Sequence, residues 1–354
     1  MQRRVEIASS HLLLIRFSAL GDVAMAGPAI TGLKKRYPHL QISLLSKPFP
    51  LQVYKHIDKL ELIAFDNNKH EGLLGIWRLS KELKATGITH CADLHFSLRS
   101  RVLTFFLRLQ GVRVTARSKE RGLRRKWVKK GPKPQQQLVS QLEHYRRAIE
   151  TLGFALEPSD FRLFDRIDRP QHAAEFDKRL VGIAPFAAHA PKKYPEKLMY
   201  QVLKGLSKKY QLVLFGSKGQ ESDQIDRWVS DNLQLINAAK FSFEQQLQWI
   251  SNLDLMISMD SANGHLAANY GVPVLTLWGA TAPECGFVPF GGGPENQLCP
   301  DPDCYPHLPA SIFGKTTFRG YENAMESISV QTILERVDQL ILPPQELPAP
   351  AVQP

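Results

Sequence analysis

Short apolar segments that alternate with helical stretches are the feature that most constrains the fold of this chain. In the second half, the apolar segments are "RLVGIAPF", "QLVLFGS", "LQLIN", "LDLMISMD" and "VPVLTLWG". The stretches between them have the spacing of amphipathic helices, which predicts βαβ units and a parallel sheet. Near-continuous apolar strands such as Val272–Trp278 indicate a sheet that is covered on both faces.

The first half repeats this pattern. The apolar run "HLLLIRF" precedes a glycine-containing turn and a helical stretch, and "HLQISLLSK" and "ITHCADLHF" have the composition of further strands. Between the last two of these segments, Leu73–Thr86 has helical spacing. After them, a second helical stretch runs from Gln141 to about Leu152 and ends at Gly153, a plausible C-cap. The polar segment "EPSDFRLFDRIDRPQ" then predicts a linker. We therefore expect an α/β protein with doubly wound domains at 1–165 and 166–318.

Beyond these domains we expect a C-terminal helix within 319–342 and a disordered, proline-rich tail at 343–354. The helical pattern of the former covers Glu322–Ile341. No run approaches the roughly 18–20 apolar residues of a membrane span, and no signal peptide is evident. Four cysteines in 354 residues are too few for a disulfide framework. These observations predict a soluble protein of a reducing compartment.

Positive charge is concentrated in one segment. Residues 113–133 carry ten Lys and Arg side chains and a single acidic one, Glu120. Such a segment favours a phosphate-rich partner, which could be a nucleic acid, an anionic membrane face or a phosphorylated glycolipid. The alternative is a solvated surface segment without a specific partner.

Three segments hold residues that could carry chemistry, each where a strand gives way to a helix. In "RFSALGDVAMAGPA", Asp22 is either a helix N-cap or a general base at the edge of a cleft. In "SMDSANGHLAA", Asp260 and Ser261 are good capping residues. Small residues such as Gly264 leave the helix N–H groups open to an anion, and His265 could donate to a phosphate.

The third segment is "APFAAHAPKKYPE", in which Lys192 is either a phosphate contact or one of a surface lysine pair. Glu221 follows the next strand and could accept hydrogen bonds from ribose hydroxyls, as many surface glutamates could. Cys299 and Cys304 lie near acidic residues and His307, but they lack the matched second pair of a zinc site, and we expect no metal. Neither GxSxG, a P-loop nor GxGxxG occurs, which disfavours a serine hydrolase, a P-loop NTPase and a nicotinamide oxidoreductase.

Taken together, these segments resemble glycosyltransferase family 9, the ADP-heptose:lipopolysaccharide heptosyltransferases. The resemblance spans roughly residues 11–340 and is nearest to the subgroup found in Bacteroidetes-like bacteria. It rests mainly on "LLLIRFSALGDVAMAGPAITGLKKRYP" and "ISMDSANGHLAANYGVPVLTLWGAT", with support from "GIAPFAAHAPKKYPE", "KFSFEQQLQWISNLDLMIS", "CADLHFSLRSR" and "SIFGKTTFRGYENAMESI".

The resemblance implies a GT-B fold, with two Rossmann-like domains facing a central cleft and a last helix that returns to the first domain. It implies an inverting, metal-independent transfer of heptose from ADP-heptose to a lipopolysaccharide inner-core acceptor, with Asp22 as the general base and no cofactor. The N-terminal domain would bind the acceptor and the C-terminal domain the nucleotide-sugar. Such an enzyme would be cytoplasmic and could contact the inner membrane peripherally.

The resemblance also implies roles for individual residues. Lys192, Ser261, Gly264 and His265 would hold the donor diphosphate, Asp260 would orient that loop, Glu221 would meet the ribose and Phe241 the base. The expected acceptor-binding residues are Ser18, Gly21, Asp93, His95, Arg99, Arg121, Arg124 and Arg125.

Other functions stay open at this point. The same fold and mechanism could serve another nucleotide-sugar or another glycolipid acceptor. A catalytically silent homologue that binds a nucleotide or glycan is disfavoured because Asp22 and Lys192 are both present. A nucleic-acid-binding protein is disfavoured because the basic segment has no recognisable nucleic-acid motif beside it.

Overall fold

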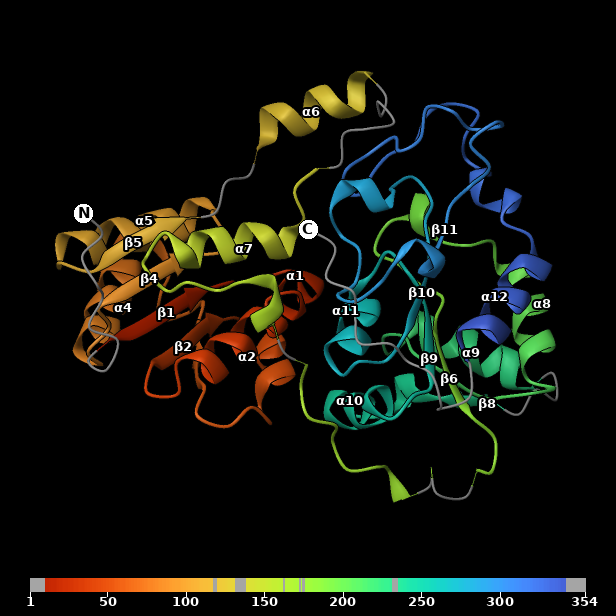
Figure 1. Ribbon diagram of the computed structural model, residues 1–354, viewed down its shortest axis with the longest axis horizontal. Helices are drawn as coiled ribbons and strands as arrows, with labels where there is room; N and C mark the ends of the chain where they lie inside the picture. The colour runs from red at the N-terminus through yellow and green to blue at the C-terminus, as the bar shows by residue number, and fades with distance from the viewer. Residues whose placement is uncertain are drawn as a thin grey trace. The chain divides into compact units, whose positions relative to one another are not determined.

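The computed structural model describes residues 10–116, 120–130, 138–161, 163–171, 173, 176–230 and 235–341. The chain forms two compact units (Figure 1). The first comprises residues up to 120 together with 139–164, and the second comprises 121–138 together with the residues from 165 onward. The chain thus passes between the units at 120–121, 138–139 and 164–165, and the last of these positions lies within the segment predicted as a linker.

The first unit contains a parallel sheet with the strand order β3-β2-β1-β4-β5. Its strands are β1 (His11–Ile15), β2 (Gln41–Ser46), β3 (Glu61–Ala64), β4 (His90–Asp93) and β5 (Arg113–Ala116). Its helices are α1 (Leu20–Ala24), α2 (Gly27–Arg36), α3 (Pro48–Leu51), α4 (Gly72–Ala85), α5 (Leu98–Leu109) and α7 (Gln141–Glu150).

Both faces of this sheet are covered, as its apolar strands require. Leu13 and Ile15 of β1 belong to the same buried cluster as side chains of α4 and α5. Leu12 and Leu14, which point to the opposite face, are equally buried. A sheet buried on both faces holds its carboxyl edge in a fixed geometry, and that edge carries the candidate residues.

The second unit contains a six-stranded parallel sheet with the order β11-β10-β9-β6-β7-β8. Its strands are β6 (Leu180–Ala184), β7 (Gln211–Leu214), β8 (Leu235–Asn237), β9 (Leu255–Met259), β10 (Val274–Leu277) and β11 (Gln297–Leu298). Its helices are α6 (Arg121–Lys130), α8 (Glu196–Leu206), α9 (Gln220–Ser230), α10 (Phe243–Ser251), α11 (Ala262–Asn269) and α12 (Val330–Leu340). The predicted α/β architecture of two doubly wound units is therefore confirmed.

The end of the chain differs from the single helical segment expected over Glu322–Ile341. The structure has a short 3₁₀ turn at Ala324–Ser327, and α12 starts only after Ser329. The hydroxyl of Ser329 accepts a hydrogen bond from the Thr332 N–H at 3.0 Å, so it caps a new helix rather than continuing the turn.

Helix α12 packs against α8, with Ile333 and Val337 in the core of the second unit. The expected return of this helix to the first domain stays a prediction. The expected disordered tail at 343–354 lies outside the described residues. No helix in the described part of the chain is long and apolar enough to cross a bilayer.

Candidate functional site

Each sheet has one position where the order of the strands reverses, and ligands of open α/β sheets bind outside the carboxyl ends of the strands there. In the first sheet, β2 and β3 are added on one side of β1, whereas β4 and β5 are added on its other side. The reversal therefore lies between β1 and β4. In the second sheet it lies between β6 and β9. Asp22, Asp93, His95, Lys192 and Asp260 lie at or after the ends of these four strands, and two other candidate residues of the second unit follow neighbouring strands.

Asp22 lies in α1, which follows β1. Ala19 occupies the N-cap position of α1, and the Asp22 carboxylate accepts a hydrogen bond from the Ala19 N–H at 3.4 Å. The carboxylate also forms an ion pair with Arg16, and its side chain is 25% exposed. Asp22 is thus not the N-cap residue. It is a positioned, solvent-accessible carboxylate that can accept a proton.

Arg16, the residue that ends the apolar run of β1, holds Asp22 in place. It is buried, and its guanidinium donates to the carbonyl of Leu94 at 2.8 Å, which ties the end of β1 to the end of β4. The guanidinium lies 5.9 Å from the centre of the Tyr145 ring, and the Tyr145 hydroxyl donates to the Asp22 carbonyl at 3.1 Å. Neither Arg16 nor Tyr145 was predicted from the sequence, although the charge that ends the apolar run was a signal for Arg16.

Asp93 and His95 lie beside this cluster, after β4. Asp93 is fully buried, and its carboxylate accepts hydrogen bonds from the backbone N–H groups of His95 and Phe96 at 2.9 and 2.8 Å. These bonds shape the turn that follows the strand. The His95 ring packs edge-on against Phe17 at 5.5 Å between centroids. Asp93 therefore supports the edge, and His95 is the more accessible of the two.

The other expected acceptor residues of the first unit lie on the same edge. Ser18 is partly exposed in the connection after β1, and Gly21 is partly exposed in the first turn of α1. Arg99 is exposed, and its guanidinium lies 5.0 Å from the centre of the Phe65 ring and donates to the Asn67 side chain at 3.3 Å. Contact of these residues with an acceptor stays a prediction.

The described residues of the basic segment include β5 and α6, and they are not uniformly exposed. Arg124 of α6 is buried, with its guanidinium 5.7 Å from the centre of the Phe287 ring in the second unit. Arg124 therefore anchors α6, and any contact of this residue with an acceptor stays a prediction. The side chains of Arg121 and Arg125 lie outside the described residues.

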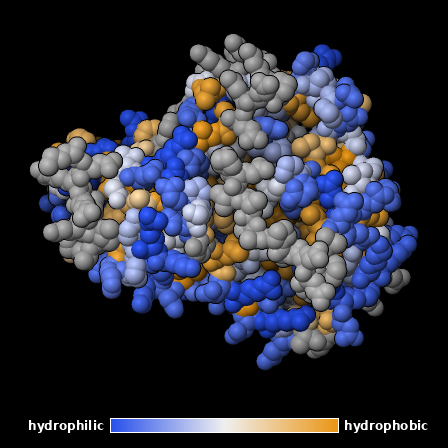
Figure 2. Space-filling model, in the orientation of Figure 1, coloured by the Kyte–Doolittle hydropathy of each residue, from blue (hydrophilic) through white to orange (hydrophobic). Residues whose placement is uncertain are grey.

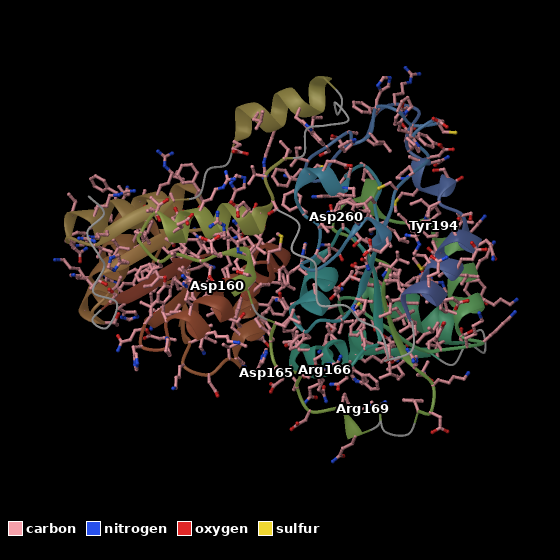
Figure 3. The ribbon with its side chains drawn as sticks, viewed as in Figure 1. Asp160, Asp165, Arg166, Arg169, Tyr194 and Asp260 are labelled. Carbon is pink, nitrogen blue, oxygen red and sulfur yellow. The ribbon has the colours of Figure 1, made fainter. Side chains whose placement is uncertain are left out.

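The candidate donor site of the second unit centres on Asp260, which follows β9 (Figure 3). Its carboxylate pairs with the Lys192 ammonium at 2.8 Å and accepts a hydrogen bond from the Thr281 hydroxyl at 2.8 Å. Both charged side chains are largely buried. Lys192 comes from the segment after β6 and Thr281 from the segment after β10, so three neighbouring strands meet in this cluster. Thr281 was not selected from the sequence.

The N-terminus of α11 lies next to Asp260. Ser261 is the N-cap residue of α11, but its side chain caps no helix N–H group and instead lies 3.0 Å from the Ser258 hydroxyl. The first N–H groups of α11 are thus left for another acceptor, and the helix dipole favours an anion there. Gly264 is tightly packed, since a Cβ there would meet Val274 at 3.3 Å, and His265 is buried in the same turn.

Gly314 gives Lys192 its space. A Cβ at Gly314 would lie 2.1 Å from Cδ and 2.4 Å from Cγ of Lys192, and the φ of +69° also favours glycine. Gly314 belongs to the irregular stretch after β11, and no pattern in the sequence connects it with Lys192. It is a second residue of this site that sequence reasoning missed.

Glu221 and Phe241 lie on the neighbouring strand connections. The Glu221 carboxylate accepts hydrogen bonds from the backbone N–H and the hydroxyl of Ser217, at 2.7 and 2.8 Å, so it orders the loop after β7. Phe241 stacks on Trp249 with 6.2 Å between ring centroids. Contacts of these two residues with a ribose and a base stay predictions.

Two ionisable groups near this site are held in their neutral form. Burial raises the pKa of the Cys285 thiol to about 12, which excludes a thiolate nucleophile there at neutral pH. Burial likewise raises the pKa of Tyr194 to about 12, and its hydroxyl donates to the carbonyl of Ile328 at 2.6 Å.

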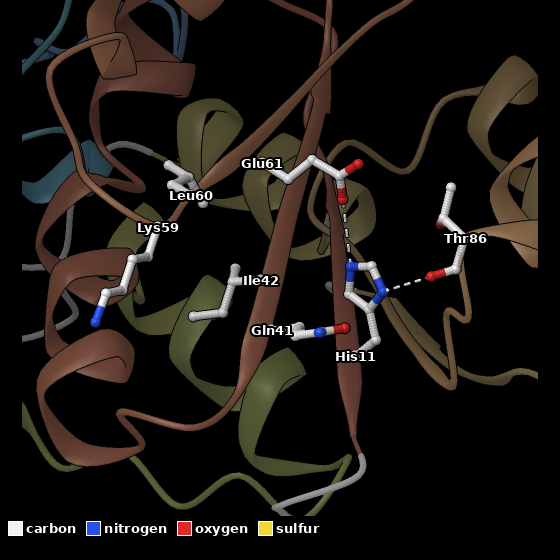
Figure 4. Close-up of a pocket in the computed structure, with 7 residues that line it drawn as sticks. All are labelled: His11, Gln41, Ile42, Lys59, Leu60, Glu61 and Thr86. Carbon is white, nitrogen blue, oxygen red and sulfur yellow. Dashed lines mark hydrogen bonds and ion pairs between the residues drawn. The ribbon is translucent and has the colours of Figure 1, made fainter.

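A separate pocket of about 510 Å³ opens at the amino edge of the first sheet (Figure 4). His11 at its wall lies 2.6 Å from the Ser43 hydroxyl and 3.5 Å from the Glu61 carboxylate. This edge is opposite to the one that carries Asp22, so the pocket is not part of the candidate site. Among the residues that the structure describes, no three His, Cys, Asp or Glu side chains come together as a metal site would require.

Comparison with known proteins adds independent findings. The sequence profile of glycosyltransferase family 9 (heptosyltransferase) matches residues 76–290. The chain is 21% identical to the lipopolysaccharide core heptosyltransferase OpsX of Haemophilus influenzae, over 94% of this chain and 97% of that protein.

Solved structures of low sequence identity share the fold. A family 9 glycosyltransferase from Veillonella parvula matches with a TM-score of 0.72 at 17% identity, covering 96% of this chain and 99% of that one. The heptosyltransferase WaaC of E. coli with ADP matches with a TM-score of 0.67 at 15% identity, covering 93% and 99%. These likenesses agree with the expected GT-B fold class.

Proposed function

The chain belongs to glycosyltransferase family 9, and from this premise we propose that it transfers heptose from ADP-heptose to an inner-core acceptor of lipopolysaccharide. That it is a glycosyltransferase follows from the family. The donor, the acceptor, inversion at the anomeric carbon and independence of metal ions are the parts that we propose.

The observation that carries the proposal is the cluster of Lys192, Asp260 and Thr281 beside the uncapped N-terminus of α11. The Lys192 ammonium has three N–H groups, and its pair with Asp260 uses one of them. The others are available to phosphate oxygens, and the α11 N–H groups add further donors for an anion. Similarity to WaaC, whose structure holds ADP, supports a nucleoside diphosphate as the ligand.

This cluster suits the chemistry of the donor. Glycosyl transfer passes through an oxocarbenium-like state, and the diphosphate gains negative charge as its bond to the sugar breaks. Lys192, the N-terminus of α11 and His265 would stabilise that charge, which is the task a divalent cation performs in other transferases. Asp260 and Thr281 hold the ammonium in position rather than contact the sugar.

Asp22 would serve the acceptor. The acceptor hydroxyl oxygen attacks the anomeric carbon on the face opposite the diphosphate, the bond from that carbon to the diphosphate oxygen breaks, and the hydroxyl proton passes to the Asp22 carboxylate. Attack on the opposite face inverts the anomeric centre. Arg16 fixes the position of the carboxylate, and the partial exposure of Asp22 leaves it open to a substrate.

The relative OpsX acts on the lipopolysaccharide core, which supports a phosphorylated, lipid-anchored saccharide as the acceptor. The basic residues of 113–133 would attract such an anionic acceptor. In this role the enzyme works in the cytoplasm at the inner face of the membrane.

Titration of the purified protein by calorimetry tests the donor. ADP, UDP, GDP and NAD⁺ are compared without added metal, for the wild type and for Lys192→Ala. We expect selective binding of ADP that weakens in the variant. Preference for UDP or GDP would exclude ADP-heptose as the donor and leave the fold assignment unchanged. Binding of no nucleotide would contradict the donor site and favour a catalytically silent homologue.

A further inference from the structure

Exposed apolar side chains gather on two neighbouring helices of the first unit. Ten large apolar side chains of the described residues are exposed, and six of them lie on α4 and α5. Their exposed fractions range from 36% to 80%. We define the α4–α5 face by these residues, which are Leu73, Leu74, Trp77, Leu98, Phe105 and Leu109.

The face is continuous because α4 and α5 pack along each other (Figure 1). The Trp77 ring of α4 packs edge-on against Phe106 of α5 at 5.1 Å between centroids, and Phe106 lies 5.7 Å from Phe105. Other side chains of these helices, such as Ile76 and Leu103, fill the core. The exposed leucines are outside that core, and an exposed apolar patch of this kind marks an interaction surface.

Basic side chains surround these apolar groups. The two helices carry six Lys and Arg residues and one acidic residue, Glu82, which lies 3.4 Å from His70. The Lys81 ammonium lies 4.6 Å from the centre of the Trp77 ring, and Arg78, Arg101 and Arg108 are exposed. A second copy of the chain would bring the same positive charge against this face, so self-association is disfavoured.

We propose that the α4–α5 face binds an anionic lipid bilayer. Leucine, tryptophan and phenylalanine inserted at the boundary between headgroups and acyl chains, with lysine and arginine against anionic headgroups, are the components of an interfacial membrane-binding surface. On the one face of the molecule that Figure 2 draws, hydrophilic residues predominate among the coloured ones, with apolar groups between them.

The position of this face connects it with the acceptor, a step that rests on the proposed function. Leu73 and Leu74 are in the first turn of α4, and Leu98 begins α5. In a parallel α/β sheet the amino ends of the helices lie at the carboxyl edge of the strands, which is the edge that carries Asp22. Binding of the face to a bilayer would thus bring a lipid-anchored hydroxyl to the side of the sheet where Asp22 lies.

Co-sedimentation with vesicles tests the proposal without donor or acceptor. Vesicles of phosphatidylglycerol and phosphatidylethanolamine are compared with vesicles of phosphatidylcholine, at low and high salt. We expect the wild type to bind the anionic vesicles and to dissociate as salt increases. Quenching of Trp77 fluorescence by brominated lipid, with Trp77→Phe as the reference for the other tryptophans, reports insertion of this face directly.

The combined variant Leu73→Ser, Leu74→Ser and Phe105→Ser should lower partitioning into anionic vesicles by at least about tenfold, because each change removes inserted apolar groups. Leu163→Ser is the matched control, since Leu163 is 45% exposed elsewhere in the same unit, and it should leave partitioning unchanged. Arg78→Gln with Arg101→Gln and Arg108→Gln should weaken binding and reduce its dependence on salt.

Unchanged partitioning of the combined serine variant would overturn the proposal. So would a concentration-dependent dimer of the wild type that this variant abolishes, since the occupant would then be a second copy. Transfer to a soluble, lipid-free acceptor separates the two claims. If the protein binds vesicles but does not transfer the sugar to the soluble acceptor, the proposed function is contradicted. If it transfers the sugar but does not bind vesicles, the proposed bilayer surface is contradicted.

Discussion

Gly314 lies against the methylene groups of Lys192, so one added methyl group tests the donor site without a change of charge. In Gly314→Ala the new Cβ would stand 2.1 Å from Cδ of Lys192. The lysine side chain has to move, and we expect this shift to displace its ammonium from the Asp260 carboxylate, which now lies 2.8 Å away. The variant should therefore reduce the affinity for ADP although it replaces neither charged residue.

The magnitude follows from the contact that is displaced. A hydrogen bond to a charged group contributes about 1.5–3 kcal/mol, so the Kd for ADP should increase roughly tenfold to hundredfold. Alanine in the left-handed region adds a cost of about 1–2 kcal/mol to folding. Gly320→Ala is the matched control, because Gly320 has a φ of +84° and no atom within 4 Å of the added Cβ.

Both variants should lose similar stability in thermal unfolding, and only Gly314→Ala should lose affinity in calorimetric titration with ADP. If Gly314→Ala binds ADP as tightly as Gly320→Ala does, Lys192 does not hold the diphosphate, and the assignment of the donor site is wrong.

Three further predictions concern other residues. Arg16→Gln should lower turnover by about tenfold to hundredfold and leave the Kd for ADP unchanged, because the contacts that are lost, to Asp22 and to the Leu94 carbonyl, lie in the first unit and not in the donor site. Equal losses in both quantities would indicate a general loss of structure. Thr281→Val should lower the free energy of unfolding in urea by about 1.5–3 kcal/mol, since the buried Asp260 carboxylate loses a hydrogen bond at 2.8 Å; Thr281→Ser should retain most of it. Burial, together with the nearby Arg113, lowers the pKa of His90 below 6.5. As the pH falls, His90 is protonated in the unfolded chain before it is protonated in the folded protein. The free energy of unfolding is therefore not reduced by His90 above about pH 6.5, and it decreases as the pH falls below that value. Urea unfolding at about pH 7.5 and about pH 5.5 should therefore show a larger loss for the wild type than for His90→Gln, and identical losses would exclude His90 as the cause.

The strands and the edges that carry the site could be predicted from the sequence because they depend on local patterns. Predominantly apolar runs such as His11–Ile15 and Leu255–Met259 indicate buried parallel strands, and polar residues in the connection that follows each run are expected near the carboxyl edge. Asp22 and Asp260 were found in this way. Neither inference needed knowledge of distant contacts.

The partners of these residues could not be predicted, because they come from distant loops without periodicity. Thr281 reaches Asp260 across 21 positions, and Gly314 meets Lys192 from an irregular stretch rich in glycine and proline. The number of basic residues in the segment also does not show which of them are exposed. Arg124 and Trp127 are buried, and this could not be predicted from the charge alone. The start of α12 was missed because Ser329 is one of several polar residues that could equally have been inside a helix.

The central claim is that this glycosyltransferase uses Asp22 as the general base for transfer from ADP-heptose. The most direct measurement is the turnover of Asp22→Asn against the wild type, with ADP-heptose and a heptose-free inner-core acceptor, together with the Kd of each protein for ADP. If Asp22 is the base, turnover should fall by about 10²–10⁴-fold with an unchanged Kd. Near-normal turnover of Asp22→Asn would contradict the claim.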